Sequence, residues 1–323
     1  MTNQDLLQIA EEFGTPVYVY DADSIKSQYE KLTTSFAEST KFFYACKSLT
    51  NINILKYVEK LGANLDCVSI NEVKLGLKAG FSPERILFTP NCVDLAEIEE
   101  AMALQVHINI DNISILEQFG TKYGDSYPVF LRINPHIFAG GNYKISTGHI
   151  DSKFGISIHQ MRHIERVMKS TNLNIEGLHM HTGSEIKDPE VFLQGLEIMF
   201  ELSESFPNLK YIDMGSGFKV PYQKGEMETD VKSLGKKVEK AVAQFKKETG
   251  KDFELWFEPG KYLVSKSGHF LVKSNVIKQT TATVFVGVNS GFNHLIRPMF
   301  YDSYHVIENL TNPKGTERIY TVV

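Results

Sequence analysis

Short apolar runs alternate with helix-like segments through most of this 323-residue chain. Eight such runs, rich in β-branched and aromatic residues, cover residues 41–47, 64–69, 85–90, 106–111, 129–135, 175–183, 211–218 and 254–260. Amphipathic segments of helical length lie between them, and several end at a glycine such as Gly62, Gly80 or Gly250, which is a common helix stop. Strict alternation implies a parallel sheet, and eight units predict an α/β fold, a closed (β/α)8 barrel of the TIM type.

Two regions lie outside this alternation. Residues 14–20 (GTPVYVY) have the composition of a strand, and after about residue 264 short strand-like runs replace the strand–helix units. We therefore expect residues 1–24 to contribute to a β domain, residues 25–264 to form the barrel, and residues 265–323 to form a C-terminal antiparallel β domain. The last run reaches Val323 without a polar tail, so this domain is expected to be truncated.

The composition limits which binding partners and which cellular compartment are expected. Hydrophobic residues make up 42% and charged residues 23%, the mixture of an ordinary globular enzyme. A net charge of −5 without a basic stripe argues against nucleic acid, and no apolar run has the length of a membrane span. The three cysteines, Cys46, Cys67 and Cys92, lack metal-ligand spacing. Their odd number predicts reduced thiols in the cytoplasm.

Candidate functional residues follow the ends of several predicted strands. In barrels of this kind the active site lies at the carboxyl ends of the strands, which meet around one opening. The residues at these ends are Lys47 after the first strand, His181, Gly183 and Ser184 at the sixth, Gly215, Ser216 and Gly217 at the seventh, and Glu258, Gly260 and Lys261 at the eighth.

Three of these features suggest a specific chemistry. Lys47 follows an apolar strand, so partial desolvation is expected to lower its pKa and free its amine to attack a carbonyl. The Gly-Ser-Gly turn at 215–217 can expose backbone N–H groups to a phosphate. Glu258 can keep a heterocyclic nitrogen protonated. A solvated lysine, a plain tight turn and a structural ion pair are the respective alternatives.

A metal site is the competing interpretation of the sixth strand. His179 and His181 share one face of it, as in barrel hydrolases that bind metal. Such a site needs further ligands at neighbouring strand ends, and we find none on the seventh strand, so no metal is expected. His181 can instead stack its flat ring on a cofactor, and His179 is then a packed core histidine.

Seven short stretches together resemble fold-type III pyridoxal-phosphate enzymes, specifically the diaminopimelate decarboxylases. They are FYACK (43–47), DCVSINE (66–72), LRINP (131–135), STGHIDSKFGI (146–156), HTGS (181–184), EPGK (258–261) and RPMFY (297–301). The resemblance runs from about Gly14 to the last residue. It implies decarboxylation of meso-2,6-diaminopimelate to L-lysine and CO2, the last step of lysine biosynthesis, with pyridoxal 5'-phosphate as cofactor. It also implies a homodimer with sites at the interface.

The resemblance implies roles at the matching positions. Lys47, His181 and Glu258 are the implied catalytic residues: the first holds the cofactor covalently, the second stacks on its ring, and the third pairs with the ring nitrogen. Asp66 and Arg132 are expected either to support this site or to form a structural ion pair. The phosphate is expected at Ser184, Gly215, Gly217 and Gly260, and the substrate at Lys261, Arg297 and Tyr301.

Three departures from the family pattern stand out. Position 261 is usually Arg, so Lys261 keeps a point charge but loses the two-pronged contact with a carboxylate or phosphate. Ser216 stands where a third glycine is usual. The family's later Cys-Glu-x-Asp and Tyr-Gly segments are absent from these 323 residues.

Two alternative functions remain open. One is a fold-type III decarboxylase of ornithine, arginine or carboxynorspermidine, and the other is a non-catalytic homologue that binds the cofactor. The stretches at 146–156 and 297–301 favour diaminopimelate.

Overall fold

The computed structural model describes residues 1–137, 152–315 and 318–323. The first part of the family-like stretch at 146–156 therefore lies outside the described residues. The chain divides into two compact units. The larger unit comprises Lys26–Val220 and Met227–Val264, and the smaller comprises Met1–Ile25, Pro221–Glu226 and Ser265–Val323.

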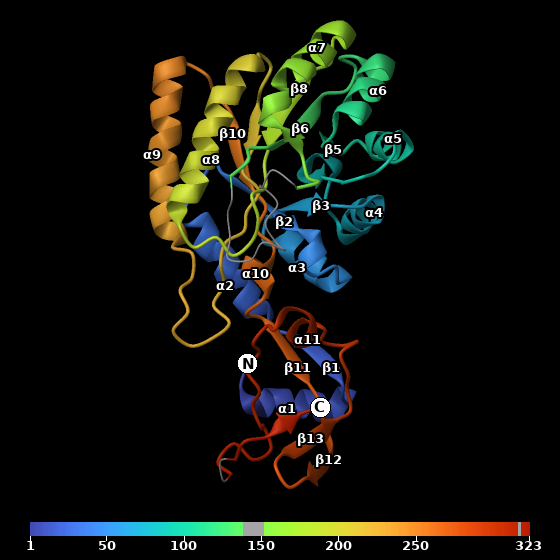
Figure 1. Ribbon diagram of the computed structural model, residues 1–323, viewed down its shortest axis with the longest axis vertical. Coiled ribbons are helices and arrows are strands. Elements are labelled where there is room, and N and C mark those ends of the chain that lie inside the picture. Colours follow the sequence, from blue (N-terminus) through green and yellow to red (C-terminus); the bar gives the residue numbers. More distant parts are fainter. Residues whose placement is uncertain (138–151, 316–317) are drawn as a thin grey trace. The chain divides into compact units, whose positions relative to one another are not determined.

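Eight parallel strands form a closed barrel in the larger unit (Figure 1). In sequence order they are β2 (Lys41–Ala45), β3 (Asn64–Cys67), β4 (Ile86–Phe88), β5 (His107–Ile110), β6 (Val129–Asn134), β8 (Ile175–His179), β9 (Tyr211–Asp213) and β10 (Glu254–Phe257). Each pairs with its neighbours in sequence order, β10 pairs with β2, and β5–β6 completes the ring. A short strand, β7 (Ile156–Ser157), runs beside β6. The predicted (β/α)8 barrel is confirmed.

Helices cover the outside of the strands (Figure 1). They are α2 (Ala22–Thr33), α3 (Ile52–Lys60), α4 (Ile70–Ala79), α5 (Leu95–Ala103), α6 (Ile113–Tyr123), α7 (Met161–Thr171), α8 (Pro189–Leu202) and α9 (Val231–Thr249). A short helix, α10 (Lys261–Val264), follows β10. Side chains such as Ser69 and Asp94 cap the first turns by accepting hydrogen bonds from backbone N–H groups. Gly80 and Gly250 end α4 and α9 in the left-handed conformation, as their positions in the sequence indicated.

The strands end earlier than their apolar runs predicted. β2 stops at Ala45, and the next three residues form a 3-10 turn, η1 (Cys46–Ser48), that carries Lys47. Further 3-10 turns cover Pro83–Arg85, Ile158–Gln160 and Ser203–Ser205. β8 ends at His179 and β9 at Asp213. The apolar runs continue because residues beyond the strand ends are also buried, for example Met180 and Met214, which pack against Gly195 of the covering helix α8.

An aromatic layer fills the amino-terminal end of the barrel. Phe43, Leu87, Phe130 and Tyr211 come from the first, third, fifth and seventh barrel strands, and Trp256 from the eighth packs with them. Layers built from alternate strands are the usual filling of such barrels. The ring of His107 contacts Phe130, Tyr211 and Trp256 edge-on at centroid distances of 5.4–5.6 Å. This layer closes one end, so a site can open only at the other.

The smaller unit is mostly antiparallel. Its elements are α1 (Asn3–Phe13), β1 (Val17–Tyr20), β11 (Gly268–Leu271), β12 (Ser274–Gln279), β13 (Val284–Val288), α11 (Arg297–Tyr301) and β14 (Thr321–Val322). β1 pairs with β11 and β12 with β13 in antiparallel fashion, as predicted, whereas β14 runs parallel to β13. Within the described ranges, no helix has the length and apolarity that a membrane crossing requires.

Candidate active site

A layer of polar side chains lies directly above the aromatic layer. Side chains of a strand alternate, so the residue two positions after an inward-facing one also faces inward. This rule takes His107 to Asn109, Phe130 to Arg132, Tyr211 to Asp213, and Trp256 to Glu258, and all four of these polar residues are buried. Asp213 was not among the residues predicted from the sequence. The same period-two step from Tyr211 was the signal that could have found it.

Lys47 is held by a fully buried carboxylate. Its Nζ donates a hydrogen bond to Asp66 Oδ2 at 2.7 Å, while the lysine side chain keeps 46% of its surface open. Burial lowers the pKa of Lys47, but the charges of Asp66 and Glu258 and the Asp66 hydrogen bond outweigh it, and the pKa is raised. The expectation of a lowered lysine pKa was therefore wrong. Asp66, at the end of the neighbouring strand, is the cause.

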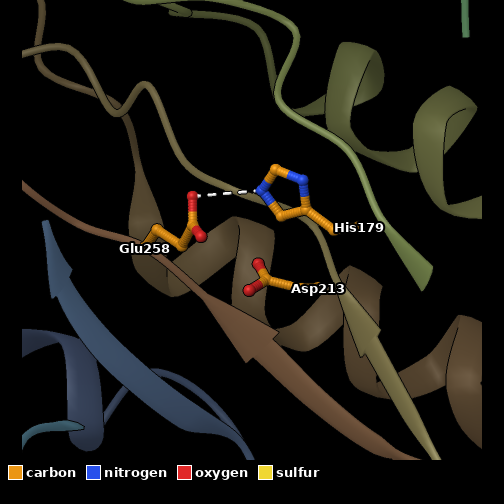
Figure 2. A group of neighbouring side chains, drawn as sticks. All are labelled: His179, Asp213 and Glu258. Atoms are coloured by element: carbon orange, nitrogen blue, oxygen red, sulfur yellow. Dashed lines mark hydrogen bonds and ion pairs between the residues drawn. The ribbon is translucent and has the colours of Figure 1, made fainter. Parts of the chain in front are cut away.

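Glu258 lies in a buried group with His179 and Asp213 (Figure 2). Ligand-capable atoms of the three side chains lie within 4.8 Å of one another, and His179 Nε2 is 3.2 Å from Glu258 Oε2. Burial and the charge of Arg132 lower the pKa of His179 well below its usual range. The neutral ring thus donates a hydrogen bond to Glu258 rather than forming a salt bridge with it.

The carboxyl groups of this cluster resist ionisation. Burial raises the pKa of Glu258, although the Lys47 and Arg132 cations oppose that effect. Burial and the neighbouring Glu258 raise the pKa of Asp213 well above its usual range. Asp213 also corrects the sequence-based statement that the seventh strand offers no further ligand beside His179.

The glycine turn packs its backbone tightly against the segment that follows β8. Gly215 and Gly217 have φ values of +59° and +111°, which favour glycine. A Cβ atom on Gly215 would lie 2.6 Å from His181 Nδ1, and one on Gly217 would lie 2.3 Å from Gly183 O. Ser216 N–H donates to His181 Nδ1 at 3.3 Å. The turn therefore orients the His181 ring, and Ser184 lies in the same packed segment.

Gly260 and Lys261 continue the rim after β10. A Cβ atom on Gly260 would lie 2.1 Å from Ser48 Oγ, so this glycine packs against the turn that carries Lys47. Lys261 Nζ is 3.7 Å from Glu185 Oε1, and Lys219 Nζ is 3.5 Å from Glu185 Oε2. Glu185 thus bridges two lysines at the rim. It is a second residue that sequence analysis did not single out.

Arg297 and Tyr301 belong to the smaller unit, at the two ends of α11. The Arg297 guanidinium lies over the rings of Tyr222 and Tyr301, with centroid distances of 5.4 and 5.9 Å, and donates to Ser303 Oγ at 3.3 Å. The other predicted site residues lie in the barrel unit. The substrate-binding role of Arg297 and Tyr301 stays a prediction.

Residues 22–265 match the family model described as "Pyridoxal-dependent decarboxylase, pyridoxal binding domain". The diaminopimelate decarboxylase of Methanothermobacter thermautotrophicus is 33% identical over 94% of this chain and 73% of the relative. The chain belongs to the diaminopimelate decarboxylase family of pyridoxal-dependent decarboxylases. It is therefore a pyridoxal-phosphate-dependent decarboxylase.

Solved structures of the family agree with this assignment. A crystal structure of a diaminopimelate decarboxylase superimposes with a TM-score of 0.87 at 34% identity, covering 95% of this chain and 73% of the other. The Helicobacter pylori diaminopimelate decarboxylase complexed with L-lysine gives 0.85 at 28% identity, covering 95% and 77%. The likeness thus extends over both compact units of the chain.

The barrel residues fit pyridoxal phosphate. Glu258 Oε1 is buried and has no hydrogen-bond donor among the described residues when the neighbouring carboxyls are ionised, so the carboxylate retains acceptor capacity for a ring N–H. Gly215 and Gly217 leave no room for side chains at the turn, and a glycine backbone can approach a phosphate closely. Lys47 supplies the amine that this class of cofactor requires.

Proposed function

We propose that this enzyme decarboxylates meso-2,6-diaminopimelate to L-lysine and CO2, the last step of lysine biosynthesis. One arrangement carries the proposal. Lys47 paired with Asp66, the buried Glu258 and the glycine turn share one barrel in a chain one-third identical to diaminopimelate decarboxylases.

Pyridoxal phosphate, when bound, supplies a ring that accepts the electrons of the breaking carbon–carbon bond. In our proposal Lys47 Nζ holds the cofactor's carbonyl carbon, and Asp66 orients that amine. Glu258 holds a proton at the ring nitrogen, and His181 packs its flat ring on the cofactor. The glycine turn lines the phosphate site, where Gly217 supplies a backbone N–H; the N–H groups of Gly215 and Ser216 donate to Asp213 and His181. The contacts of Lys47 and Glu258 in the folded protein support these assignments.

The residues at the rim bind and orient the phosphate and the substrate in this proposal. Ser184 and Gly260 complete the phosphate site in this proposal, and Lys261 contributes a positive charge to phosphate or substrate. Its ion pair with Glu185 supports a positioned rather than a freely moving charge. Arg297 and Tyr301 hold the distal, non-reacting end of the substrate.

A substrate panel tests the proposal. Purified protein supplied with pyridoxal phosphate is incubated with diaminopimelate, ornithine, arginine and carboxynorspermidine, and CO2 and the amine product are measured. We expect L-lysine from diaminopimelate and at most weak turnover of the others, with Lys47→Ala inactive. Faster turnover of one of the other amino acids would replace the proposed substrate. Cofactor binding without any turnover would support a non-catalytic homologue.

We also propose that the enzyme is a cytoplasmic homodimer with its sites at the interface. The cysteines support the location because Cys46, Cys67 and Cys92 are all free thiols. Light scattering after size exclusion should give twice the chain mass of 36.5 kDa. A mass of one chain at micromolar concentration would contradict the dimer.

A further inference from the structure

We infer that Asp213 is a positioning residue: it holds the one proton of an Asp213–Glu258 carboxyl pair and donates it in a hydrogen bond to Glu258. Glu258 then stays ionised toward the ring nitrogen of the cofactor. The inference rests on the proposed function of Glu258 and extends it to a residue with no role so far.

The two carboxyl groups form a pair that cannot be fully ionised. Asp213 is 0% and Glu258 is 5% exposed, and they point toward each other in Figure 2. As two carboxylates, they leave Asp213 Oδ2 and Glu258 Oε1 without a donor among the described residues. Two negative charges on neighbouring buried carboxyl groups repel each other strongly. A single shared proton removes the repulsion and gives both oxygens a partner, and the second lone pair of Glu258 Oε1 remains available to the ring N–H.

The local contacts assign that proton to Asp213. Asp213 Oδ1 already accepts the Gly215 N–H at 2.8 Å, which leaves Oδ2 as the donor. Glu258 accepts from His179 at its other oxygen, and two cations favour its ionised form. The charged or titratable groups around Glu258 are Lys47, Asp66, Arg132, His179, His181 and Asp213.

The proton positions agree with the directions of the shifts. The pKa of Asp213 is raised well above its usual range by burial and by Glu258. Burial raises the pKa of Glu258 as well, but the Lys47 and Arg132 cations and a hydrogen bond from Asp213 all oppose that rise. The proton therefore resides on Asp213, and Glu258 carries the negative charge.

Asp213 also joins the two ends of the cofactor site. It accepts from the backbone of Gly215 in the phosphate-binding turn, while Glu258 N–H donates to Gly215 O at 2.7 Å. A change at Asp213 is thus expected to act on the acid group and on the turn together.

Two substitutions distinguish proton donation by Asp213 from other roles of this residue. Asp213→Asn keeps an oxygen for Gly215 N–H and places an N–H donor toward Glu258, whereas Asp213→Leu removes both. The readout is binding of pyridoxal phosphate relative to an analogue with carbon in place of the ring nitrogen, measured by fluorescence titration of the apoenzyme from pH 5.5 to 8.5. This preference reports the charge on Glu258 without requiring turnover.

We expect wild type and Asp213→Asn to prefer pyridoxal phosphate equally across the pH range. In Asp213→Leu the preference should fall by about tenfold or more at the acid end, because Glu258 without its donor takes up a proton at higher pH. If Asp213→Asn lost as much of this preference as Asp213→Leu, an ionised Asp213 would be required and the inference would be overturned. A normal, pH-independent preference in Asp213→Leu would also overturn it.

Glu258→Gln separates this inference from the proposed function. If it abolishes the preference for the ring nitrogen, Glu258 has the proposed role and the Asp213 variants decide the inference. If Glu258→Gln leaves the preference intact, the proposed role of Glu258 fails and the inference falls with it. Should Asp213→Leu not fold, as judged by far-UV circular dichroism, Asp213→Asn alone still decides between a neutral donor and an anion.

Discussion

The pair Lys47–Asp66 shows how one buried carboxylate sets the charge of a residue at the rim. Asp66 has no exposed surface and lies 2.7 Å from the ammonium group. Its attraction outweighs the desolvation that would otherwise lower the lysine pKa. The apoenzyme therefore keeps Lys47 protonated at neutral pH, and the position of the amine is set by an ion pair.

Removing this carboxylate should lower the pKa of Lys47. Burial lowers the lysine pKa and Asp66 raises it, so Asp66→Asn leaves the lowering effect less opposed. We expect Lys47 in the Asp66→Asn apoenzyme to be acylated at lower pH than in wild type. Pulse labelling with acetic anhydride and peptide mass spectrometry measures the pH midpoint.

The surface pair Lys246–Asp252 supplies a matched control. Asp252 is 83% exposed, so Asp252→Asn removes an ion pair without touching the barrel interior. The midpoint for Lys47 should not move in this variant. A Lys47 midpoint that is unchanged or higher in Asp66→Asn would contradict the role of Asp66.

Candidate site residues could be chosen from the sequence where a strand end coincides with reactive chemistry. Lys47, His181 and Glu258 met that condition, and the structure places them in one barrel unit, while their roles stay predictions. Asp213 was not predicted because candidates were taken from the strand ends, and the end of this strand was placed at the Gly-Ser-Gly turn that follows Asp213. The pKa of Lys47 is raised, not lowered, because Asp66 lies beside it on the neighbouring strand. Strand order alone does not supply the distance between these two side chains.

At the scale of elements, the turn after β9 depends on close backbone approach. Gly217 and Gly80 have nearly the same φ, +111° and +112°, yet a Cβ meets Gly183 O at 2.3 Å in the first and nothing within 4 Å in the second. Gly80→Ala should therefore cost only the conformational strain, about 1–2 kcal/mol. Gly217→Ala should cost at least about 1 kcal/mol more, because a backbone carbonyl cannot turn away as a side chain can.

Urea denaturation of the two variants measures this difference. Gly217→Ala should also weaken pyridoxal phosphate binding, while Gly80→Ala should leave it unchanged, since Gly80 ends α4 away from the turn. Equal unfolding free energies for the two variants would mean that the turn opens easily. The proposed phosphate site would then lose its main structural support.

Element order was the most predictable level, and element ends were the least. Eight apolar runs alternating with amphipathic segments were enough to predict the barrel, because both patterns are local. The ends of β2, β8 and β9 were placed too late, since buried residues such as Met180 and Met214 extend the apolar pattern beyond the hydrogen-bonded ladder. The parallel pairing of β14 with β13 joins segments that are distant in sequence, so no local sequence pattern predicts it.

At the scale of the whole molecule, the proposal about substrate choice rests on Arg297. The barrel unit carries Lys47 and Glu258, and the smaller unit carries Arg297. Within that unit the guanidinium lies over the rings of Tyr222 and Tyr301 and donates to Ser303. These contacts hold the planar group in place, which reduces the entropy lost when it binds a ligand.

Arg297 should therefore select substrates that end in a carboxylate. Diaminopimelate carries a second amino acid centre at its distal end, whereas ornithine carries only an amine there. A guanidinium meets a carboxylate with two parallel hydrogen bonds. Arg297→Ala should lower kcat/KM for diaminopimelate by about 100-fold or more and leave the slow reaction with ornithine nearly unchanged. Arg297→Lys keeps the charge without the fork, so it should lie between the two. Steady-state kinetics with both substrates measures the ratio, and an unchanged preference in Arg297→Ala would remove this residue from the substrate site.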